Sequence, residues 1–282
     1  MRIVLLILLM LVQAPSSADS QQLPHTQRVF VITPQVLKSA KTMVEPVAPS
    51  ARKGSVVIAF WTSEQGSVVS ARGIEGSAEL QRAAFDAIYQ WKFNLSILAS
   101  GQLVQMGSAV IVDFSKTPPA IAPKPMSAAQ VSPGFQFKCF DGMVHEDPAS
   151  VDVCRQQLGA IKADSQSTPM DRFTALDQYG LVLMKYSHDP KKALELFSQA
   201  IALAPERLKS SDSEWAYVYW HRAVAEQQSG RNSDAEKDFA VAESSLQEVA
   251  NGLKYEKSAA YYRALLASVA KQHAALLDSE NK

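Results

Sequence analysis

The stretch from Gly54 to Phe114 constrains the fold most, because its hydrophobic periodicity changes from two residues to about 3.6 and back again. Alternate residues of an extended segment point to opposite faces of a sheet. The first segment is apolar on both faces, with Val56, Ile58 and Phe60 on one and Val57, Ala59 and Trp61 on the other. We therefore expect both faces of this strand to be covered.

The rest of the stretch predicts a second strand, a helix and a third strand. A polar turn ends at Gly66, and Val68 and Val69 begin the second strand. Ser77 opens a helix with one apolar stripe. The stripe contains Leu80, Ala84, Ala87, Ile88 and Trp91. After Gly101, the segment Val104 to Phe114 alternates again, so the pattern predicts a small sheet with one helix laid across it.

This order of small and apolar residues resembles the TonB C-terminal domain family, over about residues 29–115. The residues that carry the resemblance are Gly54, Val56, Ile58, Phe60, Gly66, Val68, Leu80, Ala83, Ala84, Ala87, Ile88, Trp91, Phe93, Gly101, Val104, Ile111 and Phe114. The most specific part is the Ala-rich helix that ends in Trp91-Lys92-Phe93. Arg28 to Ile32 resembles an extra leading strand found in some of these proteins.

The resemblance implies that a partner segment pairs with the last strand of the domain, because an exposed strand edge accepts another chain by strand addition. The expected partner-binding residues are Val104, Gly107, Ser108, Val110, Ile111, Val112 and Phe114. Gly107 and Ser108 carry little side chain, so a partner backbone is expected to approach closely there. Alternatively, the leading segment Val29 to Ile32, or a second copy of the protein, covers this edge.

The N-terminus has the pattern of a signal peptide, with Arg2, an apolar run from Ile3 to Val12 and small residues at Ser16-Ser17-Ala18. The apolar run is shorter than the roughly 20 residues that span a bilayer. We expect cleavage after Ala18 and export to the periplasm of a Gram-negative bacterium. The alternative is a retained segment that anchors the chain on the periplasmic side of the inner membrane.

Composition and proline content divide the chain into six parts within an α+β fold. The predicted parts are a signal peptide at 1–18, a lead-in with one short strand at 19–53, the TonB-like domain at 54–116, a Pro/Ala-rich linker at 117–133, a Cys-containing connector at 134–167 and a tetratricopeptide-like helical domain at 168–282. Prolines at the density of the linker favour an extended, semi-rigid spacer.

Cys139 and Cys154 are the two cysteines of the chain, and an even pair in an exported protein predicts a disulfide. A metal site is the alternative, because His145, Glu146 and Asp147 lie between the two cysteines. The spacing lacks the Cys-x-x-Cys pattern of zinc sites, so we expect no bound metal.

Helix signals dominate residues 168–282. Thr168-Pro169 and Asp189-Pro190 are typical helix starts, and Gly230 is placed as a helix-ending glycine. Near Gly180, the trio Ala193, Phe197 and Ala200 resembles a tetratricopeptide repeat, and Ala235, Phe239 and Ala242 follow 42 residues later. The usual unit has about 34 residues, so an insertion near Glu206 to Ser213 is required. A plain helical bundle is the alternative, and a last helix from Glu256 to Leu277 would cap either arrangement.

Charge and motifs exclude several functions. Lys and Arg equal Asp and Glu at 28 each, so we expect no nucleic-acid partner. The chain has no phosphate-binding loop, nucleophile elbow or His-Glu-x-x-His motif, so we expect no catalytic residues and no cofactor.

The predicted function is a non-catalytic cell-envelope adaptor that binds protein or peptide partners, including segments of outer-membrane receptors. It would use strand addition at the TonB-like domain and a groove in the helical repeats. A membrane-anchored TonB-type energy transducer and an envelope enzyme without a recognisable motif are the alternatives.

Overall fold

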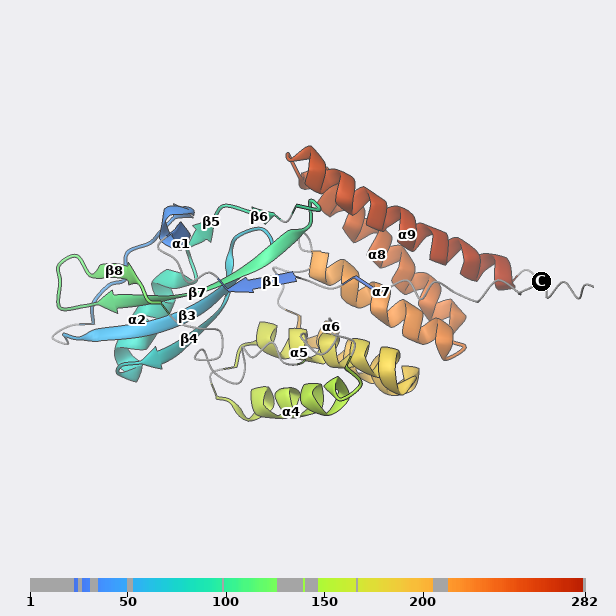
Figure 1. Cartoon of the computed structure of the whole chain (residues 1–282), viewed down its shortest axis with the longest axis horizontal. Helices are drawn as coiled ribbons and strands as arrows, with labels where there is room; N and C mark the ends of the chain where they lie inside the picture. Colours follow the sequence, from blue (N-terminus) through green and yellow to red (C-terminus); the bar gives the residue numbers. More distant parts are fainter. Residues whose placement is uncertain are drawn as a thin grey trace, which may run out of the picture.

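The computed structural model describes residues 23–24, 27–30, 35–49, 53–97, 99–125, 139, 147–165, 167–204 and 213–280. It is an α+β protein in which a mixed sheet packs between one helix and a series of helices (Figure 1). The predicted signal peptide lies outside the described residues.

The main sheet has the strand order β1-β7-β3-β4. Its strands are β1 (Gln27–Phe30), β3 (Ser55–Thr62), β4 (Val68–Glu75) and β7 (Leu103–Asp113), and the short strands β6 (Ser96–Ile97) and β8 (Ala120–Pro123) also pair with β7. β1 runs parallel to β7, and the other pairs are antiparallel. The strands β2 (Ala40–Thr42) and β5 (Lys92–Phe93) form a second, two-stranded sheet. The short helix α1 (Gln35–Lys38) precedes β2 in the chain.

One face of the main sheet packs on α2 (Ala78–Ile88). Ser77 caps this helix as the sequence predicts, since its side chain accepts a hydrogen bond from the backbone N–H of Leu80. Val56, Ile58 and Phe60 join the helix stripe in one buried cluster. Trp91, just after the end of α2, belongs to the same cluster, and its indole N–H donates to the Val44 carbonyl at 2.9 Å.

Six further helices follow in chain order within the described residues. They are α4 (Ser150–Ala163), α5 (Pro169–Val182), α6 (Pro190–Leu203), α7 (Ser213–Gln228), α8 (Asn232–Gly252) and α9 (Glu256–Glu280), with a π-helical turn η3 (Leu183–Ser187) extending α5. Each helix packs against the next one in sequence, so the chain forms a continuous helical stack (Figure 1). Thr168 and Asp189 are N-caps followed by proline, as predicted. Within the described ranges, no helix combines the length and apolar character needed to cross a bilayer.

The second face of the sheet packs on this helical stack, so the two regions form one body. Val57, Ala59 and Trp61 share a buried cluster with residues of α4, α5 and α6. Polar contacts cross the same junction, because Arg72 of β4 pairs with Asp164, and the Ser70 hydroxyl donates to the Asp171 carboxylate at 2.9 Å. The expectation that both faces of the first predicted strand are covered is confirmed.

Parts of the predicted connecting segments are structured. Residues 120–123, assigned to the linker, form β8 against β7, because an edge strand tolerates proline and its extended backbone. Residues 150–163, assigned to the connector, form α4, which buries Cys154, Leu158 and Ile161 on one face. The lead-in contains α1 and β2 in addition to a strand. The described strand is Gln27–Phe30, which includes Val29 and Phe30 of the predicted strand, and Val31 and Ile32 lie outside the described residues.

Candidate functional site

β7 is the centre of the sheet and carries neighbours along both edges within the described residues. β3 pairs with residues 107–113, and β8 pairs with residues 110–113. Gly107 is paired with Trp61 of β3 and with Phe30 of β1, so β1 lies on the edge opposite β3. The same reasoning places β8 on that opposite edge, beside β1.

The prediction that this strand offers a free edge is therefore wrong for the described residues, and the alternative that the leading segment covers it is what the structure has. β1 covers the part that contains Val104 and Gly107, and β8 covers the part that contains Val110, Ile111 and Val112. Ser108 is buried opposite Phe60, and Phe114 donates its backbone N–H to the Gly54 carbonyl at 2.8 Å.

Gly107 is small for a reason other than the one predicted. A Cβ atom at this position would lie 2.5 Å from the Trp61 ring, so the indole already occupies the space beside the glycine. The ring packs over the β7 backbone from the neighbouring strand, on the face that the helices cover. Gly107 thus serves the core of the protein, and it leaves no gap for a partner on that face.

His221 of α7 fixes the segment that precedes β1. Its side chain is fully buried, and Nε2 lies 2.7 Å from the Pro24 carbonyl oxygen. A carbonyl oxygen only accepts, so Nε2 carries the hydrogen and donates it. Nδ1 lies 2.7 Å from a carboxylate oxygen of Asp177 on α5, which orients the ring. Leu23 packs beside this contact against two of the buried clusters.

Two carboxyl groups lie inside the junction between the β3–β4 turn and α7. Glu64 is fully buried, and the Ser213 hydroxyl donates to its Oε2 while the Tyr262 hydroxyl lies 3.3 Å from the same atom. Burial, together with the charge of the nearby Glu214, raises the pKa of Glu64 to about 8. Gln105 of β7 donates to Glu214 at 2.8 Å. Glu64 is therefore a neutral acid at pH 7.

Sequence reasoning missed this pair. Glu64 lies in a polar turn between two strands, a position that is normally solvated, but here Ser213 of α7 and Tyr262 of α9 contact its carboxyl group. The same junction buries the hydroxyl-bearing rings of Tyr217 and Tyr262, and burial raises the pKa of both phenols further. No local pattern around residue 64 distinguishes it from an exposed turn residue.

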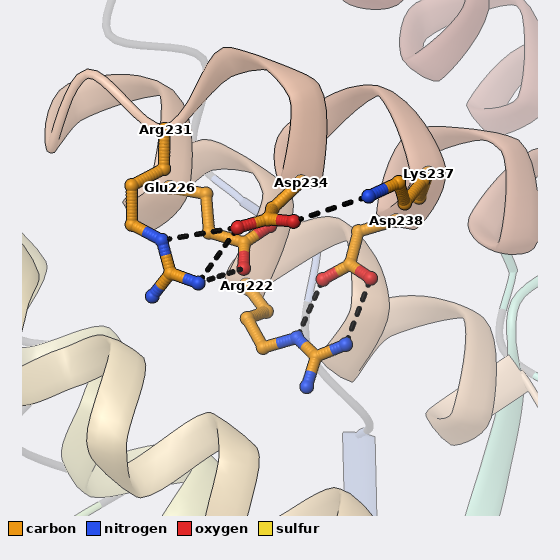
Figure 2. Close-up of polar contacts among 6 residues, drawn as sticks. All are labelled: Arg222, Glu226, Arg231, Asp234, Lys237 and Asp238. Carbon is orange, nitrogen blue, oxygen red and sulfur yellow. Dashed lines mark hydrogen bonds and ion pairs between the residues drawn. The ribbon is translucent and has the colours of Figure 1, made fainter.

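A network of charged side chains joins α7 to α8 at their connecting turn (Figure 2). Arg222 donates two hydrogen bonds to Asp238, at 2.5 and 2.8 Å, and Arg231 binds Asp234 at 2.7 Å. Glu226 lies within 4.0 Å of Arg231, and burial, followed by the charge of Asp238, raises its pKa to about 7. The Arg222–Asp238 pair joins α7 to α8, whereas the contacts of Asp234 with Arg231 and Lys237 lie within the start of α8.

Cys139 and Cys154 are joined by a disulfide, as the sequence predicts, with both side chains buried. The bond ties residue 139 to α4. Of the alternative metal ligands, His145 and Glu146 lie outside the described residues. In the part of the chain that the structure describes, no group of three or more His, Cys, Asp or Glu side chains is arranged to hold a metal ion.

The two predicted helical trios are buried at equivalent places. Ala193, Phe197 and Ala200 of α6 are fully buried, and so are Ala235, Phe239 and Ala242 of α8. Gly180 of α5 faces Phe197, because a Cβ on this glycine would lie 2.4 Å from the ring. Ala223 of α7 is buried in one cluster with Phe239, and it lies 12 residues before Ala235, whereas Gly180 lies 13 residues before Ala193.

Comparison with known proteins gives no family assignment: no protein-family model matches this chain, and no curated protein matches it.

Proposed function

We propose that this chain is a non-catalytic adaptor of the bacterial cell envelope that binds an extended segment of a partner protein as an added strand beside β7. The observation that carries the proposal is the edge of β7 opposite β3. Two short segments from different parts of the chain, β1 and β8, already share that edge. Because this edge of β7 takes up short extended segments, we infer that it accepts a partner segment in place of one of them, which frees the backbone donors and acceptors that strand addition requires.

Two sequence resemblances support an adaptor. The order β3, β4, α2, β7 is the order expected for a TonB-like domain, and Phe60, Trp91 and Phe93 pack together in its core. The paired trios of α6 and α8 are what two copies of a tetratricopeptide-like unit would bury. Stacked helix pairs of this kind commonly bind a peptide or a partner helix, so we assign the helical region a second protein-binding role.

The periplasm is the proposed location. The apolar run from Ile3 to Val12 supports export, and the Cys139–Cys154 disulfide is stable in an oxidising compartment. A non-catalytic role is favoured because Glu64, the carboxyl group whose pKa burial raises to about 8, is fully enclosed. It belongs to the packed junction between the sheet and the helices.

Site-specific crosslinking in host cells tests this function. A photo-reactive amino acid replaces Ala120 or Ala122, which are exposed on β8 beside the proposed edge, and Glu195, exposed on α6, serves as the control. We expect one envelope protein to crosslink at both β8 positions and not at residue 195. The same products from all three positions, or none from β8, would contradict strand addition.

A further inference from the structure

The segment before the main sheet attaches at two places, one on the sheet and one on the helices. We call Leu23–Pro24 together with Gln27–Phe30 the strap. On the sheet, Gln27 to Phe30 pair in parallel register with Val104 to Gly107 of β7. On the helices, the Pro24 carbonyl accepts the hydrogen bond from His221. The strap therefore bridges the two regions along the edge where a partner strand is proposed.

The sheet contact of the strap is small and is not supported by a hairpin. β1 has four residues, whereas β3 and β4 have eight each. Parallel pairing is slightly less stable per residue than antiparallel pairing. β1 also reaches β7 from the lead-in, while β8 follows β7 directly in the chain. On the edge of β7 opposite β3, which β1 and β8 share, β1 is thus the segment most easily exchanged for another one.

Removal of the strap would leave the remaining sheet intact. β7 keeps β3 along residues 107–113 and β8 along residues 110–113, and α2 still covers its own face. The newly available surface would consist of the outer backbone of Val104 to Gly107, the place of Leu23 and the Nε2–H group of His221. Asp177 would continue to orient the His221 ring through Nδ1.

We propose that the strap occupies the partner's place and is displaced when the partner binds. This inference rests on the proposed function. The displacing segment pairs in parallel with Val104 to Gly107 of β7, as β1 does. Three residues before its first paired residue, it offers a backbone carbonyl to His221, in the way that Pro24 lies three residues before Gln27. An apolar side chain directly before that carbonyl takes the place of Leu23. The partner is therefore an extended segment of another protein, and His221 is the residue that sets its register.

A labelled peptide of residues 21–33 of this chain is the binding probe, measured by fluorescence anisotropy. We expect a strapless variant that begins at residue 34 to bind the peptide at least ten-fold more tightly than the strap-containing chain does. His221→Gln in the strapless variant should weaken binding several-fold, and a peptide of scrambled order should not bind. Equal binding by the two proteins, or equal binding of the scrambled peptide, would overturn the proposal.

Amide hydrogen exchange of the strap-containing chain provides a test that needs no deletion. We expect the β1 amides to exchange at least ten-fold faster than those of Ile58 and Phe60 in β3, and His221→Gln to accelerate exchange in β1 alone. Equal protection of β1 and β3 would overturn the proposal. So would transfer of isotope-labelled straps between copies in a stable dimer, because the occupant would then be a second copy.

The two proposals fail separately. Crosslinking of a partner at Ala122 together with a strap that does not exchange would retain the adaptor function and reject the strap. Peptide exchange without any crosslinked partner would retain the exchangeable strap and reject the adaptor function.

Discussion

At the scale of single residues, Glu64 links the stability of the protein to pH. Its pKa is about 8 in the folded protein, above the ordinary value of 4.5. Between these two values the folded state holds a proton that the unfolded state has lost, so the free energy of unfolding falls as the pH rises through this window. The contribution of the neutral acid is fully present below pH 4.5 and is lost by about pH 8.

Glu64→Gln is expected to remove this dependence, because the amide keeps the shape of the neutral acid and does not ionise. The variant should match the wild type in free energy of unfolding near pH 4 and exceed it by about 2 to 4 kcal/mol at pH 8. Urea unfolding at several pH values measures the difference. Glu195→Gln, an exposed change on α6, is the control and should follow the wild type. A constant difference at all pH values would contradict the assignment.

Gly180 and Gly159 make a matched pair in two neighbouring helices. Gly→Ala within a helix normally stabilises by roughly 0.5 to 1 kcal/mol. A Cβ at residue 180 meets the Phe197 ring at 2.4 Å, whereas one at residue 159 meets nothing within 4 Å. We therefore expect Gly159→Ala to raise the melting temperature and Gly180→Ala to lower it.

The double variant Gly180→Ala/Phe197→Leu tests the cause of that loss. If the added methyl group clashes with the ring, the double variant should lose less stability than the sum of its two single changes. Strict additivity would show that the ring is not what makes residue 180 a glycine.

At the scale of elements, the disulfide fastens residue 139 to α4. The sequence separation of its cysteines is 15 residues, for which chain entropy predicts a stabilisation of about 3 kcal/mol. The Cys139→Ser/Cys154→Ser variant should lose about this free energy of unfolding. Mass spectrometry of the non-reduced protein checks the bond, and two free thiols or an equal amount of copurified zinc would refute it.

Elements with strong local signals were predictable. Ser77, Thr168 and Asp189 cap helices where the sequence places caps, and β7 differs from its predicted bounds by one residue at each end. α4 carries a readable signal as well, since Cys154, Leu158 and Ile161 follow helical spacing. β8 does not, because its alanines and prolines are extended in a linker and in an edge strand alike. Only the pairing with β7 shows that this segment is an edge strand and not part of a linker.

At the scale of the whole molecule, the sheet and the helical stack depend on each other. Val57 and Trp61 bury their side chains against the helices, and the helices bury part of their own apolar surface in return. A fragment of residues 134–282 exposes that surface to water. We expect it to melt at a lower temperature and over a broader range than the full chain, as circular dichroism would measure. A fragment that melts as cooperatively and as high as the full chain would contradict this.

The arrangement of the two regions was beyond the sequence. The alternation of Val57, Ala59 and Trp61 indicates a covered face, but periodicity does not say which distant segment covers it. The same limit applies to Glu64 and to His221, whose roles arise from partners far away in the chain, Ser213 and Pro24. Local sequence patterns therefore predict the helices and strands, whereas the sites depend on contacts between residues that are distant in the chain.

The pairing of β1 along the edge of β7 has a mechanical consequence. A pull on the strap along the strand axis acts on all the ladder hydrogen bonds of Gln27 to Phe30 at once, and the His221–Pro24 hydrogen bond shares that load. A pull perpendicular to the sheet would instead open these hydrogen bonds one after another. The strap therefore resists lengthwise tension better than peeling, and the direction of an applied force decides how readily the edge of β7 is uncovered.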